Sequence, residues 1–396
     1  MADIRFETKD GVLTVFLTGR VDSQNAAAVG DELDAIRAEN PCGKLVIDLG
    51  DLSYISSAGL RVLLREKKAV PDTHVINASP EVYEILDMTG FTEMLNVTRA
   101  YRTISVEGCE VIGRGANGEV YRIDPETIVK VYLNPDSIDE ITRERELART
   151  AFVLGVPTAI SYDVVKVKEG GFGSVFELLN AKSCAKLMKT GEKTVAEVAK
   201  MSIDLLKTIH STVVKPDAMP SMKEVARGWV DCAKRALPAD AYEKFAELMD
   251  ALPEDLHMIH GDYHTNNVMY QNGETLLIDM DSLSHGDPVF EFAGIYNANV
   301  GFSELDHKNI EGFLGITFEQ GKEFWRKSLE LYFGTEDDGV IRAEEDKARV
   351  MAYARMIRRV YAHGWENSES GAATLRNCVG NMAEILPRVD SLSMRE

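Results

Sequence analysis

The feature that most constrains this chain is a polar loop from His260 to Asn267, which is followed by the apolar segment Leu277-Ile278-Asp279. The loop carries the carboxylate of Asp262 and the carboxamide of Asn267, and the apolar segment ends in a second carboxylate. Phosphoryl transfer from a nucleotide needs one carboxylate to orient or deprotonate the acceptor hydroxyl, and an Asn with an Asp to hold Mg²⁺ against the phosphates. We therefore predict that Asp262 is catalytic, that Asn267 and Asp279 are metal ligands, and that Asp279 lies on a strand.

A glycine-rich segment upstream supports this interpretation. The run from Ile112 to Tyr121 reads Gly-x-Gly-x-x-Gly-x-Val followed by an aromatic residue, and it lies between apolar strands. Glycines let a backbone close over phosphates without interference from side chains. A hairpin turn that binds no ligand would show the same glycines. In this order of motifs we predict that Gly113, Gly115 and Gly118 cover the triphosphate of ATP.

The next candidate is Lys130, in the alternating strand pattern Ile128-Val129-Lys130-Val131-Tyr132. A lysine at this place can reach the α- and β-phosphates, although a surface lysine on an edge strand would look the same. A glutamate on the following helix should pair with it and orient its ammonium group. Further on, the segment 173–180 is typical of a last strand and a hinge, where backbone groups near Glu177 and Leu179 are expected to contact adenine.

The order of these parts resembles a known family. The sequence His260-Gly261-Asp262, with Gly after the His, and the later segment 286–293 are similar to aminoglycoside phosphotransferases and choline-kinase-like enzymes rather than to typical protein kinases. The resemblance covers about residues 105–396. It implies an α+β bilobal protein-kinase-like domain, with an N-lobe of about 105–180 and a C-lobe of about 181–396, that uses ATP and Mg²⁺.

The same resemblance selects one glutamate and shows one departure. Glu144 matches the family in its distance from the Gly155-Val156-Pro157 turn, so it is the predicted partner of Lys130, and Glu146 is held in reserve as a solvated residue. The family usually has Asp where this chain has Glu291, at a position that we interpret as structural.

Residues 1–100 have a different pattern, in which short strands alternate with helices, as in a small α/β domain. Strand patterns flank the turn at Lys9-Asp10-Gly11, and a helix is predicted from Asn25 with Ser23 as its cap. The segment 51–64 resembles STAS domains, the fold of anti-sigma factor antagonists. That resemblance implies an anti-sigma factor as a candidate partner and makes Ser57 the candidate phosphoacceptor. The alternative is that Ser56 or Ser57 merely caps a helix.

Composition limits the partners further. A chain of 396 residues suits two or three domains, and its net charge of −20 offers no basic field for nucleic acid or an anionic membrane. There is no apolar run of membrane-spanning length and no signal-peptide pattern at the N-terminus. The five cysteines are scattered, which favours free thiols over a zinc site or a disulfide framework. We therefore expect a cytoplasmic protein.

Three functions fit these observations. The first is an ATP-dependent kinase of a small-molecule hydroxyl, regulated by its STAS-like domain. The second is a kinase whose acceptor is a protein serine such as Ser57, and the third is a non-catalytic nucleotide-sensing module. The complete set of Lys130, Asp262, Asn267 and Asp279 weighs against the third. No Ala-Pro-Glu signature follows Asp279, which favours a small-molecule acceptor over a protein.

Two acidic segments bear on the identity of that acceptor. Asp337-Asp338 and Glu344-Glu345-Asp346 would suit a cationic acceptor such as an aminosugar or a choline-like amine. A solvated helix face is the simpler interpretation of the same residues. The sequence therefore indicates a hydroxyl acceptor without identifying it.

Overall fold

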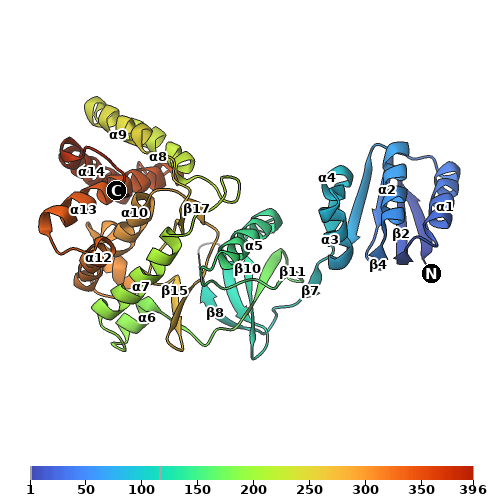
Figure 1. The fold of residues 1–396 in the computed structure, drawn as a ribbon, viewed down its shortest axis with the longest axis horizontal. Coiled ribbons are helices and arrows are strands. Elements are labelled where there is room, and N and C mark those ends of the chain that lie inside the picture. Colours follow the sequence, from blue (N-terminus) through green and yellow to red (C-terminus); the bar gives the residue numbers. More distant parts are fainter. Residues whose placement is uncertain (1, 116–117, 135, 396) are drawn as a thin grey trace. The chain divides into compact units, whose positions relative to one another are not determined.

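A computed structural model describes residues 2–115, 118–134 and 136–395. Within the glycine-rich segment, Ala116 and Asn117 lie outside the described residues. The chain divides into two compact units. The first holds the chain up to Glu107 together with Val164–Gly171, and the second holds Gly108–Asp163 and the chain from Phe172 onward. Figure 1 labels the elements of both units.

The first unit is a sheet with helices. Its strands are β1 (Asp3–Lys9), β2 (Val12–Val21), β3 (Lys44–Asp48), β4 (Leu52–Ile55), β5 (Thr73–Ala78) and β6 (Val97–Arg99). The sheet has the order β1-β2-β3-β5-β6, and β4 pairs with β2. Strand β1 is antiparallel to β2, whereas the pairs β2–β3, β3–β5, β5–β6 and β2–β4 are parallel. The predicted hairpin turn is present, because Asp10 and Gly11 have the consecutive positive φ angles of 49° and 78° that tight hairpin turns require.

The helices of this unit are α1 (Ala26–Glu39), α2 (Ser57–Ala69), α3 (Pro80–Met88) and α4 (Phe91–Leu95). In β2 the buried Leu13, Val15 and Leu17 alternate with less buried residues, so one face of the strand joins the core. The prediction of Ser23 as the cap of α1 is wrong. The N-cap residue is Asn25, whose side chain accepts the Asp22 amide at 2.8 Å and so fixes the turn before the helix. A further parallel pair joins β7 (Arg102–Ile104) to β11 (Asp163–Val167).

The second unit begins with four antiparallel strands and one long helix. The strands are β8 (Glu110–Arg114), β9 (Gly118–Arg122), β10 (Thr127–Tyr132) and β12 (Phe172–Glu177), and the helix is α5 (Ile138–Val153). Strand β9 pairs with β8 and with β10, and β10 pairs with β12 in a register that places Lys130 opposite Ser174. This strand order puts the glycine-rich segment next to the strand that carries Lys130.

The rest of the second unit is mainly helical. Its helices are α6 (Cys184–Lys189), α7 (Val195–His210), α8 (Met222–Ala236), α9 (Ala239–Ala251), α10 (Pro288–Asn299), α11 (Lys308–Phe313), α12 (Phe318–Phe333), α13 (Asp338–Ala362) and α14 (Glu369–Ile385), with the 3₁₀ turns η1 (Gly301–Ser303) and η2 (Leu386–Arg388). Its short strands are β13 (Lys182–Ser183), β14 (Met258–Ile259), β15 (Val268–Gln271), β16 (Glu274–Leu277) and β17 (Ser284–His285). Antiparallel pairing joins β15 to β16 and β14 to β17.

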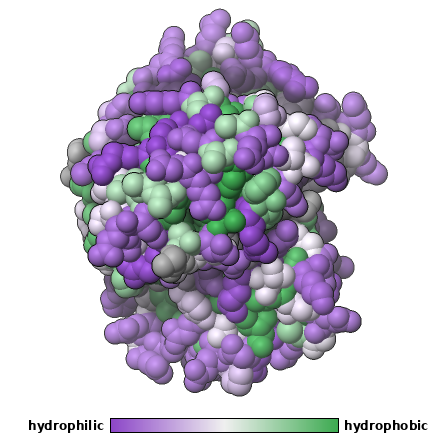
Figure 2. Space-filling view, turned by 90° about the vertical axis from the view of Figure 1, so that its right-hand side faces the viewer, coloured by the Kyte–Doolittle hydropathy of each residue, from purple (hydrophilic) through white to green (hydrophobic). Residues whose placement is uncertain are grey.

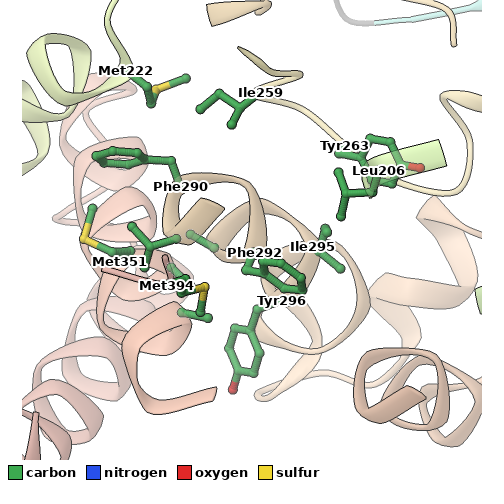
Figure 3. Packing of buried hydrophobic residues seen from close by; sticks show 14 of the residues in the cluster. Leu206, Met222, Ile259, Tyr263, Phe290, Phe292, Ile295, Tyr296, Met351 and Met394 are labelled. Atoms are coloured by element: carbon green, nitrogen blue, oxygen red, sulfur yellow. The ribbon is translucent and has the colours of Figure 1, made fainter. Parts of the chain in front are cut away.

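The core of the second unit surrounds α10, in which every residue except Gly294 is buried. Side chains of this helix lie between Met351 and Met394 on one side and Leu206 and Tyr263 on the other (Figure 3). Tyr263 belongs to the polar loop, and its hydroxyl donates to the backbone carbonyl of Ser202 in α7 at 2.6 Å. The loop is therefore fixed to the helical core by one of its own side chains.

The face drawn in Figure 2 is largely hydrophilic, with smaller hydrophobic areas between the polar residues. Among the helices of the described residues, none is both long enough and apolar enough to cross a membrane.

Candidate active site

The predicted residues of the second unit meet at one cavity of about 600 Å³. It lies between the antiparallel strands with α5 and the polar loop with the segment that follows β16. All ten candidates in this unit line it, namely Gly113, Gly115, Gly118, Lys130, Glu144, Glu177, Leu179, Asp262, Asn267 and Asp279. Residues that are far apart in the sequence therefore share one solvent-accessible space.

Lys130 and Glu144 form the expected ion pair. The Lys130 Nζ lies 3.2 Å from the Glu144 Oε1, and the carboxylate is buried on the inner face of α5. The other carboxylate oxygen accepts the Tyr132 hydroxyl at 2.7 Å, and that hydroxyl also lies 3.2 Å from the Ser174 Oγ. Glu146 is exposed, as expected of the reserve candidate. The glutamate on α5 thus has two donors that hold it in place.

Burial and charge act in opposite directions on this pair. Burial alone would lower the pKa of the Lys130 ammonium, but the carboxylates of Glu144 and Asp279 raise it well above its ordinary value. Burial raises the pKa of Glu144, and the ammonium and the Tyr132 hydroxyl only partly offset this effect. Lys130 therefore remains a fixed positive charge at the cavity, which is what orientation of phosphates requires.

Asp279 lies close to the lysine but not on a strand. Strand β16 ends at Leu277, so the prediction of a strand position for Asp279 is wrong. Its φ angle is +64°, a conformation that L-residues other than Gly, Asn and Asp rarely adopt and that costs free energy. The turned backbone presents the carboxylate to the cavity, where its Oδ1 accepts from the Lys130 Nζ at 2.6 Å.

The polar loop is held from behind by Glu291 at the start of α10. This fully buried carboxylate accepts the backbone amides of His260 and Gly261, the latter at 3.0 Å. Burial would raise the pKa of Glu291, but His210, His260 and the amides lower it below its ordinary value. These contacts fit the structural interpretation of the position, and the longer Glu side chain makes them where related chains have Asp.

Gly261 is required by the geometry of the loop. Its φ angle is +81°, and a Cβ atom added there would lie 2.4 Å from the backbone carbonyl oxygen of Ser282. A side chain is therefore excluded both by the backbone conformation and by the close approach of a neighbouring segment. The glycine after the histidine, which marks the family in the sequence, has this steric cause.

Asp262 faces the cavity, and His264 and Arg355 lie beside its carboxylate. Its carboxylate lies 3.6 Å from the His264 Nε2 and 3.5 Å from the Arg355 Nη2. Burial would raise the pKa of Asp262, but His264, Arg355 and His260 lower it to about 2. The side chain is 45% exposed, so it remains accessible to a substrate. This group is a carboxylate at neutral pH and a weak base, suited to accept a hydrogen bond from a hydroxyl.

The residues fit a divalent cation in part. The Asn267 side-chain amide donates to the Asp262 carbonyl at 3.0 Å, which leaves its Oδ1 as an acceptor, and Asp279 supplies a carboxylate to the same cavity. Oxygen atoms of this kind are the ligands that Mg²⁺ prefers. In the described part of the chain no group of three or more His, Cys, Asp or Glu side chains could hold a metal ion. A cation here would need further ligands from the substrate and water.

Asp281 also lines the cavity, and its position two residues after Asp279 marks it in the sequence. Arg355 and Arg359 of α13 line the cavity with no motif to mark them. The available signal was the spacing of the two arginines, which places them on one side of a helix. Burial together with Asp279 raises the pKa of the Asp281 carboxyl.

The acidic segments have partners within the fold instead of lining the cavity. Asp337 caps α13 by accepting the Gly339 and Val340 amides, and Asp338 pairs with Arg326. The second segment is used similarly. Asp346 accepts two donors from Arg388, Glu345 accepts the Trp325 ring N–H, and Glu344 pairs with Lys347. These contacts account for both segments without a cationic acceptor.

The candidate serine of the first unit lies at the start of a helix. Ser56 is the N-cap residue of α2, and its Oγ accepts the Gly59 amide at 3.4 Å. Ser57 is the first residue of the helix and is exposed. Capping is therefore performed by Ser56, and the hydroxyl of Ser57 faces solvent near the positive end of the helix dipole.

Comparison with known proteins supports the two parts separately. The Phosphotransferase enzyme family (APH) matches residues 108–326, more than half of the chain, and the STAS domain family matches residues 3–105. The chain therefore belongs to the phosphotransferase enzyme family and carries an N-terminal STAS domain. The predicted fold class, an α/β STAS-like domain followed by a bilobal kinase-like domain, is confirmed.

Relatives of the first unit are anti-sigma factor antagonists. BtrV of Bordetella bronchiseptica, named as such a protein, is 36% identical over 95 residues, which are 23% of this chain and 81% of that protein. The anti-sigma F factor antagonist of Paenibacillus polymyxa is 29% identical over 98 residues, 24% of this chain and 84% of that protein.

Similar solved structures include two kinase-like proteins. ADP-bound aminoglycoside phosphotransferase APH(2'')-Ib has a TM-score of 0.49 and 17% identity, covering 77% of this chain and 98% of that one. A choline/ethanolamine kinase family protein from Mesorhizobium loti has a TM-score of 0.45 and 16% identity, covering 71% and 88%.

Proposed function

We propose that the second unit transfers the γ-phosphoryl group of ATP to the hydroxyl of a small molecule, and that the STAS domain regulates this activity. The observation that carries the proposal is the arrangement around one cavity of Lys130, Glu144, Asp262, Asn267 and Asp279. Phosphoryl transfer depends on positioning and on stabilisation of charge, and these residues supply both.

Each group has a separate part in the proposed transfer. Lys130, held by Glu144, binds the α- and β-phosphates, and the glycine-rich segment covers them. The acceptor oxygen forms a bond to the γ-phosphorus while the bond from that phosphorus to the β–γ bridging oxygen breaks, which yields ADP and the phosphorylated acceptor. The hydroxyl proton passes to Asp262. A carboxylate with a pKa of about 2 is a weak base, so its main part is to orient the hydroxyl, and the proton leaves late.

Asn267 and Asp279 are the proposed Mg²⁺ ligands. The metal would neutralise charge on the β- and γ-phosphates. The Lys130 Nζ and the Asp279 Oδ1 are 2.6 Å apart. The ammonium and the carboxylate would therefore have to separate slightly as phosphates enter between them. Adenine would contact backbone groups of the hinge near Glu177 and Leu179, which line the same cavity. The Leu178 amide between them is not available to adenine, because it donates to the Glu126 carbonyl at 2.7 Å.

The short segment after Asp279 supports a small acceptor. Helix α10 begins at Pro288, so residues 280–287 alone connect Asp279 to it, and they include β17. A protein-kinase activation segment, by contrast, extends from its metal-binding Asp to an Ala-Pro-Glu signature and supports regulation and peptide binding. A segment this short gives little backbone against which a peptide could lie.

Incubation of the full chain with labelled ATP and Mg²⁺, with and without a panel of hydroxyl compounds, tests the proposal. We expect label on a small molecule, and a decrease of about 10²–10⁴-fold in Asp262→Ala and in Asp279→Ala, with the fold retained by circular dichroism. Transfer at the unchanged rate in either variant would contradict the assigned roles.

A second candidate acceptor is Ser57. It is exposed at the first residue of α2, while Ser56 serves as the cap. A phosphate there would accept from free backbone amides at the helix N-terminus. Label on the peptide that contains Ser57, absent in Ser57→Ala, would favour this alternative, in which the chain or a second copy of it is the substrate.

A further inference from the structure

Two arginines of α13 bring positive charge to the acceptor side of the cavity. Arg355 and Arg359 are one helical turn apart, and both line the cavity that holds Asp262. The cavity is also lined by carboxylates, among them Asp279 and Asp281, so these two arginines offset negative charge at one end of it. The Arg355 Nη2 lies 3.5 Å from the Asp262 carboxylate, which locates this pair of arginines beside the proposed position of the acceptor hydroxyl.

Aromatic rings support both guanidinium groups. Arg355 lies over the ring of Trp229, with 5.8 Å between the guanidinium carbon and the ring centroid. Arg359 lies over Phe302 at 5.2 Å and near Trp365 at 6.0 Å. In the described part of the chain, Arg359 forms no ion pair with a carboxylate. A guanidinium that rests on a ring keeps its N–H edge available for a planar anion.

A second cavity of about 460 Å³ begins at Arg359. Its walls are largely apolar and aromatic, and they include Phe302, Phe313 and Trp365. Arg359 is the one charged residue among the described residues that line it. The ring of Phe313 also contacts the ring of His264 in the polar loop, with centroids 5.0 Å apart. The second cavity therefore adjoins the loop that carries Asp262, and Arg359 borders both spaces.

From this juxtaposition we infer that the acceptor is a small hydroxyl compound with an anionic group, a carboxylate or a phosphate, and an apolar body. The anionic group binds Arg359, with Arg355 beside it, the apolar body occupies the second cavity, and the hydroxyl faces Asp262. The inference rests on the proposed function, whose acceptor it specifies. Charge-assisted bonds from arginine to carboxylate or phosphate are short and strong, so such an acceptor is selected over neutral and cationic analogues.

The competing use of these arginines is to bind the phosphates of ATP, since both line the larger cavity as well. The two uses differ in a measurable way. If Arg359 binds the acceptor, its removal weakens acceptor binding and leaves nucleotide binding unchanged. If it binds the nucleotide, its removal weakens binding of Mg·ADP or of the analogue Mg·AMP-PNP.

The matched control is Arg358, which is exposed on the same helix and lines neither cavity. The full chain, Arg359→Gln and Arg358→Gln are compared for ADP formation with triplets of hydroxyl compounds that differ in one group. One triplet is 3-phenyllactate, its amide, and 1-amino-3-phenylpropan-2-ol, in which an aminomethyl group replaces the carboxylate and the hydroxyl keeps its place. A further pair is glycerol phosphate against glycerol. Calorimetric titration with Mg·AMP-PNP runs in parallel.

We expect the anionic members to raise ADP formation most, and Arg359→Gln to raise their KM about tenfold or more with kcat within about twofold. Arg358→Gln should behave as the unchanged chain, and all three should bind Mg·AMP-PNP equally. Activity of glycerol phosphate but not of phenyllactate would identify phosphate as the anionic group and would contradict the apolar body.

Three outcomes would overturn the inference. They are a preference for the neutral or amine members, equal effects of Arg358→Gln and Arg359→Gln, or no stimulation by any compound while Mg·AMP-PNP still binds. Weaker binding of Mg·AMP-PNP by Arg359→Gln would assign the arginine to the nucleotide instead. Failure of the unchanged chain to bind Mg·AMP-PNP would instead contradict the proposed function itself.

Discussion

The two sides of the cavity differ in how their charges are compensated. On the nucleotide side, Lys130 is bound by both Glu144 and Asp279, and Glu144 is held in turn by Tyr132. On the acceptor side, Arg359 rests on aromatic rings without a carboxylate partner in the described part of the chain. The proposed nucleotide side is thus preorganised by contacts within the protein. On the proposed acceptor side Arg355 pairs with Asp262, whereas Arg359 is left for a ligand to complete. The difference separates what is common to phosphoryl transfer from what is particular to this chain.

The loop between the two sides is held in place by Glu291 and Tyr263, and Gly261→Ala should disturb it with the largest effect of the variants considered. The variant adds a Cβ atom 2.4 Å from the Ser282 carbonyl oxygen and forces Ala into a left-handed conformation. We expect the free energy of unfolding of the second unit to fall by about 3 kcal/mol. Denaturant titration followed by tryptophan fluorescence measures this, because Trp229, Trp325 and Trp365 all lie in the second unit.

Gly273→Ala is the control for that variant. Gly273 also has a positive φ angle, 94°, but nothing lies within 4 Å of an added Cβ atom. It should lose only about 1 kcal/mol from backbone strain. An equal loss in both variants would show that the contact with Ser282 is unimportant and that the loop is not held there.

The role of the ion pair on the proposed nucleotide side can be tested by substituting, one at a time, two glutamates of α5. Glu144→Gln removes the buried charge that orients Lys130, so we expect kcat/KM for ATP to fall about 10²-fold through misplacement of the ammonium. Glu146→Gln changes an exposed side chain two residues later and should stay within about twofold. Initial rates of ADP formation over a range of ATP concentrations give both values. Similar losses of kcat/KM in the two variants would show that the buried ion pair of Glu144 with Lys130 does not preorganise the nucleotide side.

The sequence predicts the two sides unequally, for a physical reason. Residues of a phosphoryl-transfer site occur in a fixed order on a strand, a helix and a loop, so spacing predicted Lys130, Asp262 and Asn267, and the structure brings all three to one cavity. The α/β fold of the first unit and the hairpin at Asp10-Gly11 followed from the alternation of strand and helix patterns and from turn chemistry. The kinase-like fold followed from the order of the motifs and from their resemblance to a known family. No comparable rule predicts Arg355 and Arg359, because two basic residues on one side of a helix also occur on solvated helices that bind no ligand.

Local backbone geometry was the other limit. Sequence pattern extended the strand through Asp279, but its left-handed φ angle depends on tertiary contacts that pattern does not record. The acidic segments were open to a ligand-binding interpretation because composition gives charge without partners. In the fold, Asp346 pairs with Arg388 and Glu345 with Trp325, which are distant in sequence.

The support behind the loop predicts a pH dependence. The pKa of Glu291 is lowered in the folded protein, so its ionised form contributes stability that is present above its unfolded pKa of about 4.3 and is lost as the pH falls through the folded value. Glu291→Gln should therefore reduce the free energy of unfolding at pH 7 by about 1–3 kcal/mol. The two carboxylate oxygens of Glu291 accept the His260 and Gly261 amides, and glutamine keeps only one such oxygen. Titrations that extend from pH 7 to about 2 should show a steady difference down to about pH 5 and a narrowing difference below the unfolded pKa of about 4.3. A constant difference would place the support elsewhere.

The smallest expected effect concerns the hinge, where the nucleotide side is proposed to use backbone rather than side chains. Glu177 lies at the end of β12, where it is exposed and lines the cavity. Glu177→Ala keeps the backbone and should change the Kd for Mg·ADP by less than about twofold, as for most exposed positions. Glu177→Pro restricts the same backbone and removes its N–H, so a weakened affinity would follow if that backbone contacts adenine. Isothermal titration of both variants decides between these uses. Loss of affinity in the alanine variant would mean that the Glu177 carboxylate itself contributes to binding of Mg·ADP. Nucleotide binding would then depend on an exposed charge, in contrast to the buried and paired charges of Lys130 and Glu144.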